Sequence, residues 1–192
     1  MSNKKVPMLN RHIRALSERL VQGEPLTHNM LSWAKQHVEW SLAEGDYTAH
    51  DGVLMLVIDI NGNAAMTVGE YEPLADTSAK ALRARSAEAR SEADETGVAP
   101  ELLAAVNNGE LAFVAPADEC LCGTATLIEQ LAQTKGIPVT RVDIPAQLKG
   151  ALFLVSDEHG VVPATETDAA ETDAATVAFF ADGYEKLRAR RS

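Results

Sequence analysis

The sequence has 192 residues, of which 46% are hydrophobic and 23% are charged, and its formal net charge is −11. This length allows one domain or two small ones with a buried core, and the composition is ordinary for a globular protein. The acidic balance disfavours nucleic acid and anionic membranes as partners, because both require a basic surface. It does not exclude a small anionic ligand held in a local pocket.

The two cysteines, Cys120 and Cys122, lie one residue apart. Because such close neighbours rarely form a disulfide, we expect free thiols and a reducing compartment. The five histidines are scattered and none shows the spacing of metal ligands, so we expect no metal site. No run is long or apolar enough to span a membrane, and the N-terminus lacks the apolar core of a secretory signal. We therefore expect a cytoplasmic protein.

The N-terminal region predicts two helices. Residues 9–21 carry one apolar stripe, formed by Leu9, Ile13, Leu16 and Leu20. Residues 27–43 form the second helix, with Thr27 as its N-cap. The second helix also carries a stripe that we interpret as core or subunit contact rather than as a ligand site, formed by Trp33, His37 and Trp40.

A hairpin follows these helices. Residues 52–60 are apolar at nearly every position, which predicts a strand buried on both faces. Residues 61–63 give a turn signal, and residues 64–71 alternate as a returning strand. We expect a small N-terminal α/β domain over 1–74 and a larger α/β domain over 75–192.

The second half alternates helices and strands. Residues 76–96 are rich in Ala, Arg, Ser and Glu and predict an exposed helix that Gly97 ends. Residues 101–106 fit either a short helix or a strand. Strands are expected at 111–114 and 150–155, an edge piece at 161–163, a mobile acidic loop at 165–173 and a closing helix at 176–190.

The stretch 120–144 predicts a turn, a helix, a second turn and a strand. Gly123 and Thr124 open the helix, and Lys135 and Gly136 close it. Backbone N–H groups at a helix start are unpaired, so this start can hold a phosphate. The alternative is a helix that its own threonines cap without any ligand.

The order of these elements resembles the fold-type IV, or class IV, aminotransferases that use pyridoxal phosphate. That family includes branched-chain aminotransferases, D-amino acid aminotransferases and aminodeoxychorismate lyases. The resemblance covers most of the chain and rests on four segments: LNRHIRAL at 9–16, VGEYEPL at 68–74, NGEL with CLCGTATLIEQLAQTKGIPV at 108–139, and FLVSDEHGVVP at 153–163. It implies an α/β (α+β) fold, with a small N-terminal unit and a pseudo-barrel-like C-terminal unit, and a homodimer.

The resemblance also implies site residues. Lys80 stands where the family has its Schiff-base lysine, although it also fits a solvated lysine on an Ala/Arg-rich helix. Thr124 and Ala125 stand where backbone N–H groups hold the cofactor phosphate. Asn10 replaces the phosphate-gripping arginine, and Asp157 stands where the family offers Ser or Thr to the phosphate.

The departures from the family keep two hypotheses open. One is a pyridoxal phosphate-dependent aminotransferase or lyase that acts on a small amino acid or keto acid. The other is a non-catalytic binding or scaffold protein, because the glutamate that pairs with the pyridine nitrogen is missing between Gly97 and Asn107. A carboxylate at Asp157 repels phosphate, and we predict that it pairs with the N–H groups of the Thr124 helix instead.

Overall fold

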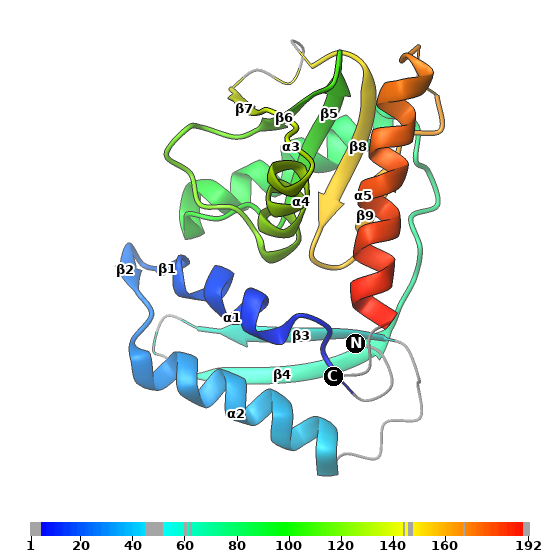
Figure 1. The fold of residues 1–192 in the computed structure, drawn as a ribbon. Coiled ribbons are helices and arrows are strands. Elements are labelled where there is room, and N and C mark those ends of the chain that lie inside the picture. Colours follow the sequence, from blue (N-terminus) through cyan, green and yellow to red (C-terminus); the bar gives the residue numbers. More distant parts are fainter. Residues whose placement is uncertain are drawn as a thin grey trace.

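The computed structural model describes residues 5–44, 52–59, 61, 63–143, 145, 148–166 and 168–189. It has the expected mixed α/β architecture. Figure 1 shows the N-terminal helices and a hairpin below a larger sheet that helices flank. None of the described helices is both long enough and apolar enough to cross a membrane.

The N-terminal elements are two helices and two pairs of strands: α1 (Leu9–Ser17), β1 (Leu20–Val21), β2 (Glu24–Pro25), α2 (His28–Glu44), β3 (Gly52–Ile58) and β4 (Ala64–Glu70). The prediction that the first helix extends to residue 21 is wrong. Gln22 and Gly23 adopt positive φ angles of 53° and 79°, and this left-handed turn folds β2 back on β1. The chain therefore leaves the helix after Ser17.

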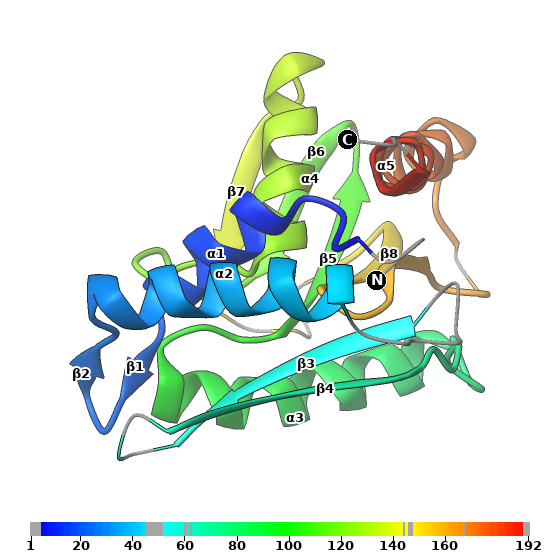
Figure 2. The ribbon, with the colours of Figure 1, turned by 90° about the horizontal axis from the view of Figure 1, so that it is seen from below.

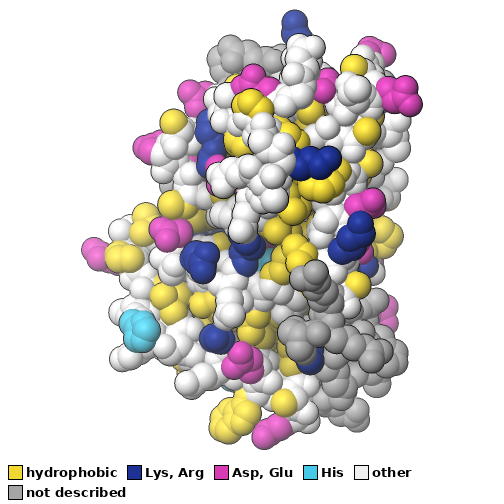
Figure 3. All heavy atoms as spheres, viewed as in Figure 1, with side chains coloured by type: hydrophobic (Ala, Val, Ile, Leu, Met, Phe, Trp, Pro, Cys, Tyr) yellow, Lys and Arg dark blue, Asp and Glu magenta, His cyan; other side chains and the backbone are white. Residues whose placement is uncertain are grey.

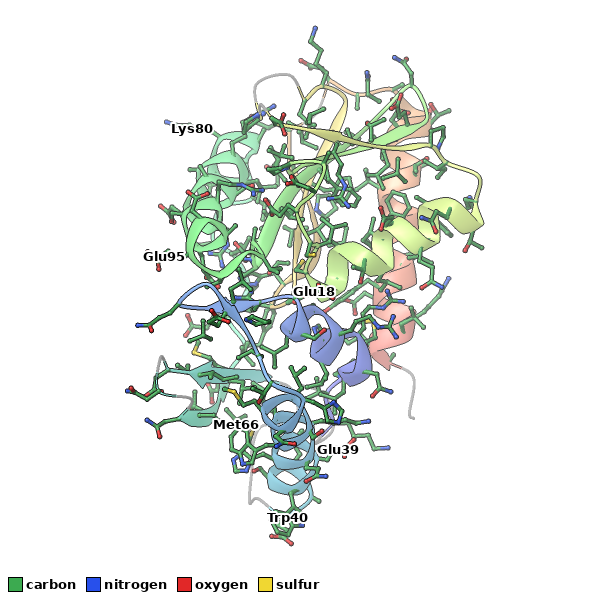
Figure 4. The ribbon with its side chains drawn as sticks, turned by 90° about the vertical axis from the view of Figure 1, so that its left-hand side faces the viewer. Glu18, Glu39, Trp40, Met66, Lys80 and Glu95 are labelled. Carbon is green, nitrogen blue, oxygen red and sulfur yellow. The ribbon has the colours of Figure 1, made fainter. Side chains whose placement is uncertain are left out.

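The second helix begins where the sequence predicts. The Thr27 hydroxyl accepts the Met30 N–H at 3.3 Å, as an N-cap does. The helix buries the inward residues Ala34, Val38 and Leu42. Trp33 stacks on His37 with ring centroids 4.6 Å apart, whereas Trp40 is 69% exposed and points outward (Figure 4).

Strands β3 and β4 form the expected antiparallel hairpin, in which Gly52 pairs with Glu70 and Ile58 with Ala64. The prediction that β3 is buried on both faces is wrong. Met55 and Val57 are 55% and 52% exposed, because no second layer of the described chain covers their side of the strand. Of the expected strand and turn, residues 60 and 62 lie outside the described part of the chain.

The C-terminal elements build one sheet with helices on both faces: α3 (Ala79–Thr96), β5 (Glu101–Asn107), β6 (Glu110–Val114), α4 (Gly123–Thr134), β7 (Val139–Val142), β8 (Ala151–Ser156), β9 (Gly160–Pro163) and α5 (Glu171–Ala189). The sheet has five strands in the order β7-β6-β5-β8-β9, and only the β6–β7 pair among them is parallel. Figure 2 shows α3 on one face and α4 and α5 on the other.

Strand β5 explains this layering. The sequence fits either a short helix or a strand here, and the structure shows a strand at the centre of the sheet. Its residues from Glu101 to Val106 are all buried. Leu102, Ala104 and Val106 share one core with α4 and α5. Leu103 and Ala105 share the other core with Leu82 of α3. Alternate side chains of this strand therefore pack against the helices on opposite faces of the sheet.

The end of the chain differs from the expected loop over 165–173. Helix α5 begins at Glu171, and Asp173 is only 3% exposed. Its carboxylate accepts the backbone N–H groups of Asn108 and Gly109 at 2.9 and 3.0 Å, which fixes α5 to the β5–β6 turn. Residue 190, the last of the expected helix, lies outside the described residues.

Candidate functional site

A cleft of about 1060 Å³ lies between the N-terminal and C-terminal elements. Residues of α1 and β3 form one side, and residues of α3, the β8–β9 turn and the end of α5 form the other. Figure 3 shows hydrophobic side chains along this boundary, with Lys and Arg side chains beside them. The start of α4 also reaches the cleft, through Cys122.

The start of α4 is bonded to a carboxylate of the same chain. Asp157 follows the last residue of β8, and its Oδ1 accepts the Thr124 N–H at 2.7 Å. Its Oδ2 accepts the Gly123 N–H at 3.2 Å. Cys122, the extended residue before the helix, provides no side-chain cap. The predicted contact between Asp157 and the helix start is therefore present, and it satisfies two of the open donors.

Helix α1 adds an imidazole to this carboxylate. His12 Nδ1 lies 3.6 Å from Asp157 Oδ2. Burial alone would raise the pKa of Asp157, but interactions with His12 and with the Thr124 N–H outweigh it and lower the pKa to about 2. Asp157 is therefore a carboxylate at neutral pH.

The close approach requires a glycine at the first position of α4. A Cβ on Gly123 would lie 2.8 Å from His12 Nδ1 and 3.3 Å from Asp157 Oδ1. Arg11 holds the same helix from its side, since it donates to Thr126 Oγ1 at 3.1 Å and to Gln130 Oε1 at 2.5 Å. The helix start, α1 and the end of β8 thus form one bonded unit.

The structure brings only some of the expected site residues together. Thr124 and Ala125 are fully buried next to Asp157. The hydroxyl of Thr124 makes no hydrogen bond within the described chain. Asn10 is exposed on α1 and is not among the described residues that line the cleft.

Lys80 lies apart from this group. It is exposed in the first turn of α3, and Figure 4 shows it at the end of that helix farther from α1 and the hairpin. No lysine occurs among the described residues that line the cleft. Arg83 donates to the Pro145 and Leu148 carbonyls, and Arg85 donates to Glu101. Both arginines are thus engaged elsewhere.

A second polar cluster escaped the sequence analysis. Glu101, 7% exposed, accepts Arg85 at 2.9 Å and the Ser156 hydroxyl at 2.8 Å through Oε1. His159 Nε2 lies 3.0 Å from an Arg85 nitrogen, and burial is the main cause that lowers the pKa of His159. A lone glutamate just before an apolar run was the available signal. The cluster joins α3, β5 and β8 at the floor of the cleft.

Three solved structures that match this chain with TM-scores of at least 0.55 identify its fold. A hypothetical aminotransferase from Mycobacterium tuberculosis, in its pyridoxal phosphate-bound form, has a TM-score of 0.58 at 9% identity over 97% of this chain and 87% of its own. A fold IV transaminase from Curtobacterium pusillum has a TM-score of 0.55 at 18% identity over 95% and 80% of the two chains. This chain has the fold-type IV aminotransferase fold.

A protein from Thermotoga maritima that is described as a branched-chain amino acid aminotransferase gives a similar result. Its TM-score is 0.55 at 16% identity over 84% of this chain and 74% of its own. No protein-family model matches the sequence, and no curated protein matches it. At these identities the likeness establishes the fold, as the four motif segments predicted.

The residues present do not fit a phosphate group at the start of α4. A phosphate there would lie against the Asp157 carboxylate, which already accepts the Gly123 and Thr124 N–H groups. The three arginines among the described lining residues do not compensate for this, because Arg19 pairs with Glu92, Arg85 with Glu101 and Arg188 with Glu185. No group of three described His, Cys, Asp or Glu residues is placed to hold a metal ion.

Proposed function

We propose that this chain is a non-catalytic ligand-binding protein that uses the fold-type IV aminotransferase frame without pyridoxal phosphate. The observation that carries the proposal is the bonding of Asp157 to the Gly123 and Thr124 N–H groups. Because Asp157 is part of the chain, the effective concentration of its carboxylate at the helix start is higher than a free phosphate reaches. The carboxylate accepts the N–H group of Thr124, which is one of the two donors that the family resemblance assigns to the phosphate, and that of the neighbouring Gly123.

The position of Lys80 supports the same proposal. A Schiff-base lysine must reach the cofactor and must be made nucleophilic by desolvation or by nearby positive charge. Lys80 is exposed, and it does not line the cleft. A lysine in this exposed position lacks the desolvation that such a nucleophile requires.

The competing hypothesis is a pyridoxal phosphate-dependent transaminase or lyase that acts on a small amino acid or keto acid. It is supported by the fold, which is similar to that of a pyridoxal phosphate-bound aminotransferase. For this hypothesis Asp157 must leave the helix start and Lys80 must enter the cleft. The homodimer, the cytoplasmic location and the domain boundary at residues 74/75 remain predictions under both hypotheses.

Borohydride fixation distinguishes the two hypotheses. The protein is mixed with equimolar pyridoxal phosphate, reduced and mapped by peptide mass spectrometry. We expect Lys80 to carry no more label than Lys149, which is also exposed. Stoichiometric label on Lys80 that is lost in Lys80→Ala, with no compensating label on Lys149, would contradict the proposal.

A further inference from the structure

The cleft has an apolar wall that nothing in the described chain covers. Val53, Met55 and Val57 share one face of β3, and all three line the cleft. Figure 2 shows the hairpin running between α2 and α3. Exposed apolar surface of this kind favours binding of the apolar part of a ligand, because binding removes both apolar surfaces from water.

The charges of the cleft oppose an anionic ligand. Its lining, within the described part of the chain, contains five carboxylates, from Glu88, Glu92, Glu101, Asp157 and Glu158. Against them stand three guanidinium groups, from Arg19, Arg85 and Arg188, and the imidazole of His12.

Each lining arginine is already paired. Arg19 and Arg85 bond to two of the lining glutamates at 2.6 and 2.5 Å. Arg188 bonds to Glu185 of its own helix at 2.9 Å. A ligand carboxylate or phosphate would therefore find no unpaired guanidinium in this lining, and it would add to an excess of negative charge.

One end of the cleft suits a cation. Tyr71, which is 37% exposed, lines it together with Glu158, whose side chain is 44% exposed and whose Oε1 lies 3.7 Å from His159 Nε2. Phenol rings attract an ammonium group through their negative faces, and a nearby carboxylate adds direct attraction. The cations closest to this end are already engaged, since Arg188 pairs with Glu185 and Arg85 with Glu101.

We infer that the cleft binds an amphiphilic amine, with the apolar part along Val53, Met55 and Val57 and the ammonium group beside Tyr71 and Glu158. This inference rests on the proposed function, since it names the ligand class of the same cleft. An apolar wall with a carboxylate and a phenol ring at one end matches a molecule that is apolar along its length and cationic at one end.

Calorimetric titration of the full chain tests the inference with three probes of equal chain length: octylammonium, octanol and octanoate. We expect affinity to fall in that order, with at least a tenfold difference between the cation and the anion. Hexylammonium should bind more weakly, by about fourfold for each methylene removed. Octanoate binding as tightly as octylammonium would overturn the inference, and so would an affinity that does not depend on chain length.

Two substitutions locate the binding mode. Glu158→Gln should weaken octylammonium about three- to fivefold and leave octanol unchanged, whereas Met55→Ser should weaken both probes alike. Glu95→Gln removes the same charge from an exposed position of α3 that does not line the cleft, and it should change neither (Figure 4). Equal effects of Glu158→Gln and Glu95→Gln would contradict the ammonium position.

This inference and the proposed function can fail separately. If no amine binds and Lys80 carries no label, this inference alone is overturned, whereas stoichiometric label on Lys80 overturns the proposed function.

Discussion

The start of α4 and the exposed face of β3 border the same cleft. They differ in whether other residues of the chain already bond to or cover their groups. At the start of α4, the Asp157 carboxylate accepts two backbone N–H groups and His12 lies beside it. On β3, Met55 and Val57 remain more than half exposed. The polar part of the cleft therefore needs no ligand for its stability, whereas the apolar part gains from one.

The largest effect is expected from Gly160, which begins β9 just after the turn that carries Asp157. Gly160 has a φ of +72°, and a Cβ there would lie 2.3 Å from the Tyr184 ring. Gly160→Ala should lower the free energy of unfolding by about 3 kcal/mol. Gly69→Ala in the hairpin is the matched control, because that Cβ meets nothing within 4 Å. Denaturant unfolding of both variants measures the difference, and equal losses would contradict it.

The second prediction concerns the carboxylate at the helix start. Asp157→Ala removes the acceptor of two N–H groups and the negative charge at the positive end of the helix. We expect the free energy of unfolding to fall by about 2 kcal/mol at pH 7. Asp157→Asn, which keeps an acceptor oxygen but no charge, should lose about half as much. A neutral effect of Asp157→Ala would show that this contact does not stabilise the protein.

The third prediction is a pH dependence with a defined sign. The pKa of Asp157 is lowered from 3.8 to about 2 in the folded protein. A depressed carboxyl pKa contributes stability above the unfolded value, and that contribution is lost as the pH falls through the folded value. The wild type should therefore lose about 1–2 kcal/mol more than Asp157→Asn between pH 5 and pH 2. Parallel losses in the two proteins would contradict the low pKa.

These expectations also show what the sequence was able to predict. The contact of Asp157 with the Thr124 helix was predicted from the family resemblance, which places the residue after this strand next to the start of that helix. The bounds of α4 follow from Gly123 and Gly136. The exposure of β3 could not be predicted from the sequence, because an apolar run does not reveal whether a second layer covers the strand.

The site was harder to predict than the fold. The family resemblance implies Lys80 as a Schiff-base lysine, but the residue is exposed in the first turn of α3, which begins at Ala79. Glu101 and Asp173 were missed, because each becomes buried only through partners that are distant in the sequence, namely Arg85 with Ser156 and the β5–β6 turn. Their partners are set by packing, which local patterns do not encode.

The smallest effect on stability is expected on the exposed side of the comparison. Met55→Ser changes a side chain that is 55% exposed, so the free energy of unfolding should change by less than about 0.5 kcal/mol. Denaturant unfolding measures it at pH 7. A loss of about 2 kcal/mol would mean that this face is covered in solution and is not open to a ligand.

The most direct test of the central claim is a calorimetric titration of inorganic phosphate and pyridoxal phosphate into the wild type and Asp157→Thr. The account predicts that Asp157→Thr binds both at least tenfold more tightly than the wild type, because the Gly123 and Thr124 N–H groups become free for an anion. Pyridoxal without its phosphate should bind the two proteins alike. Tight binding of pyridoxal phosphate by the wild type, with no change in Asp157→Thr, would contradict the account.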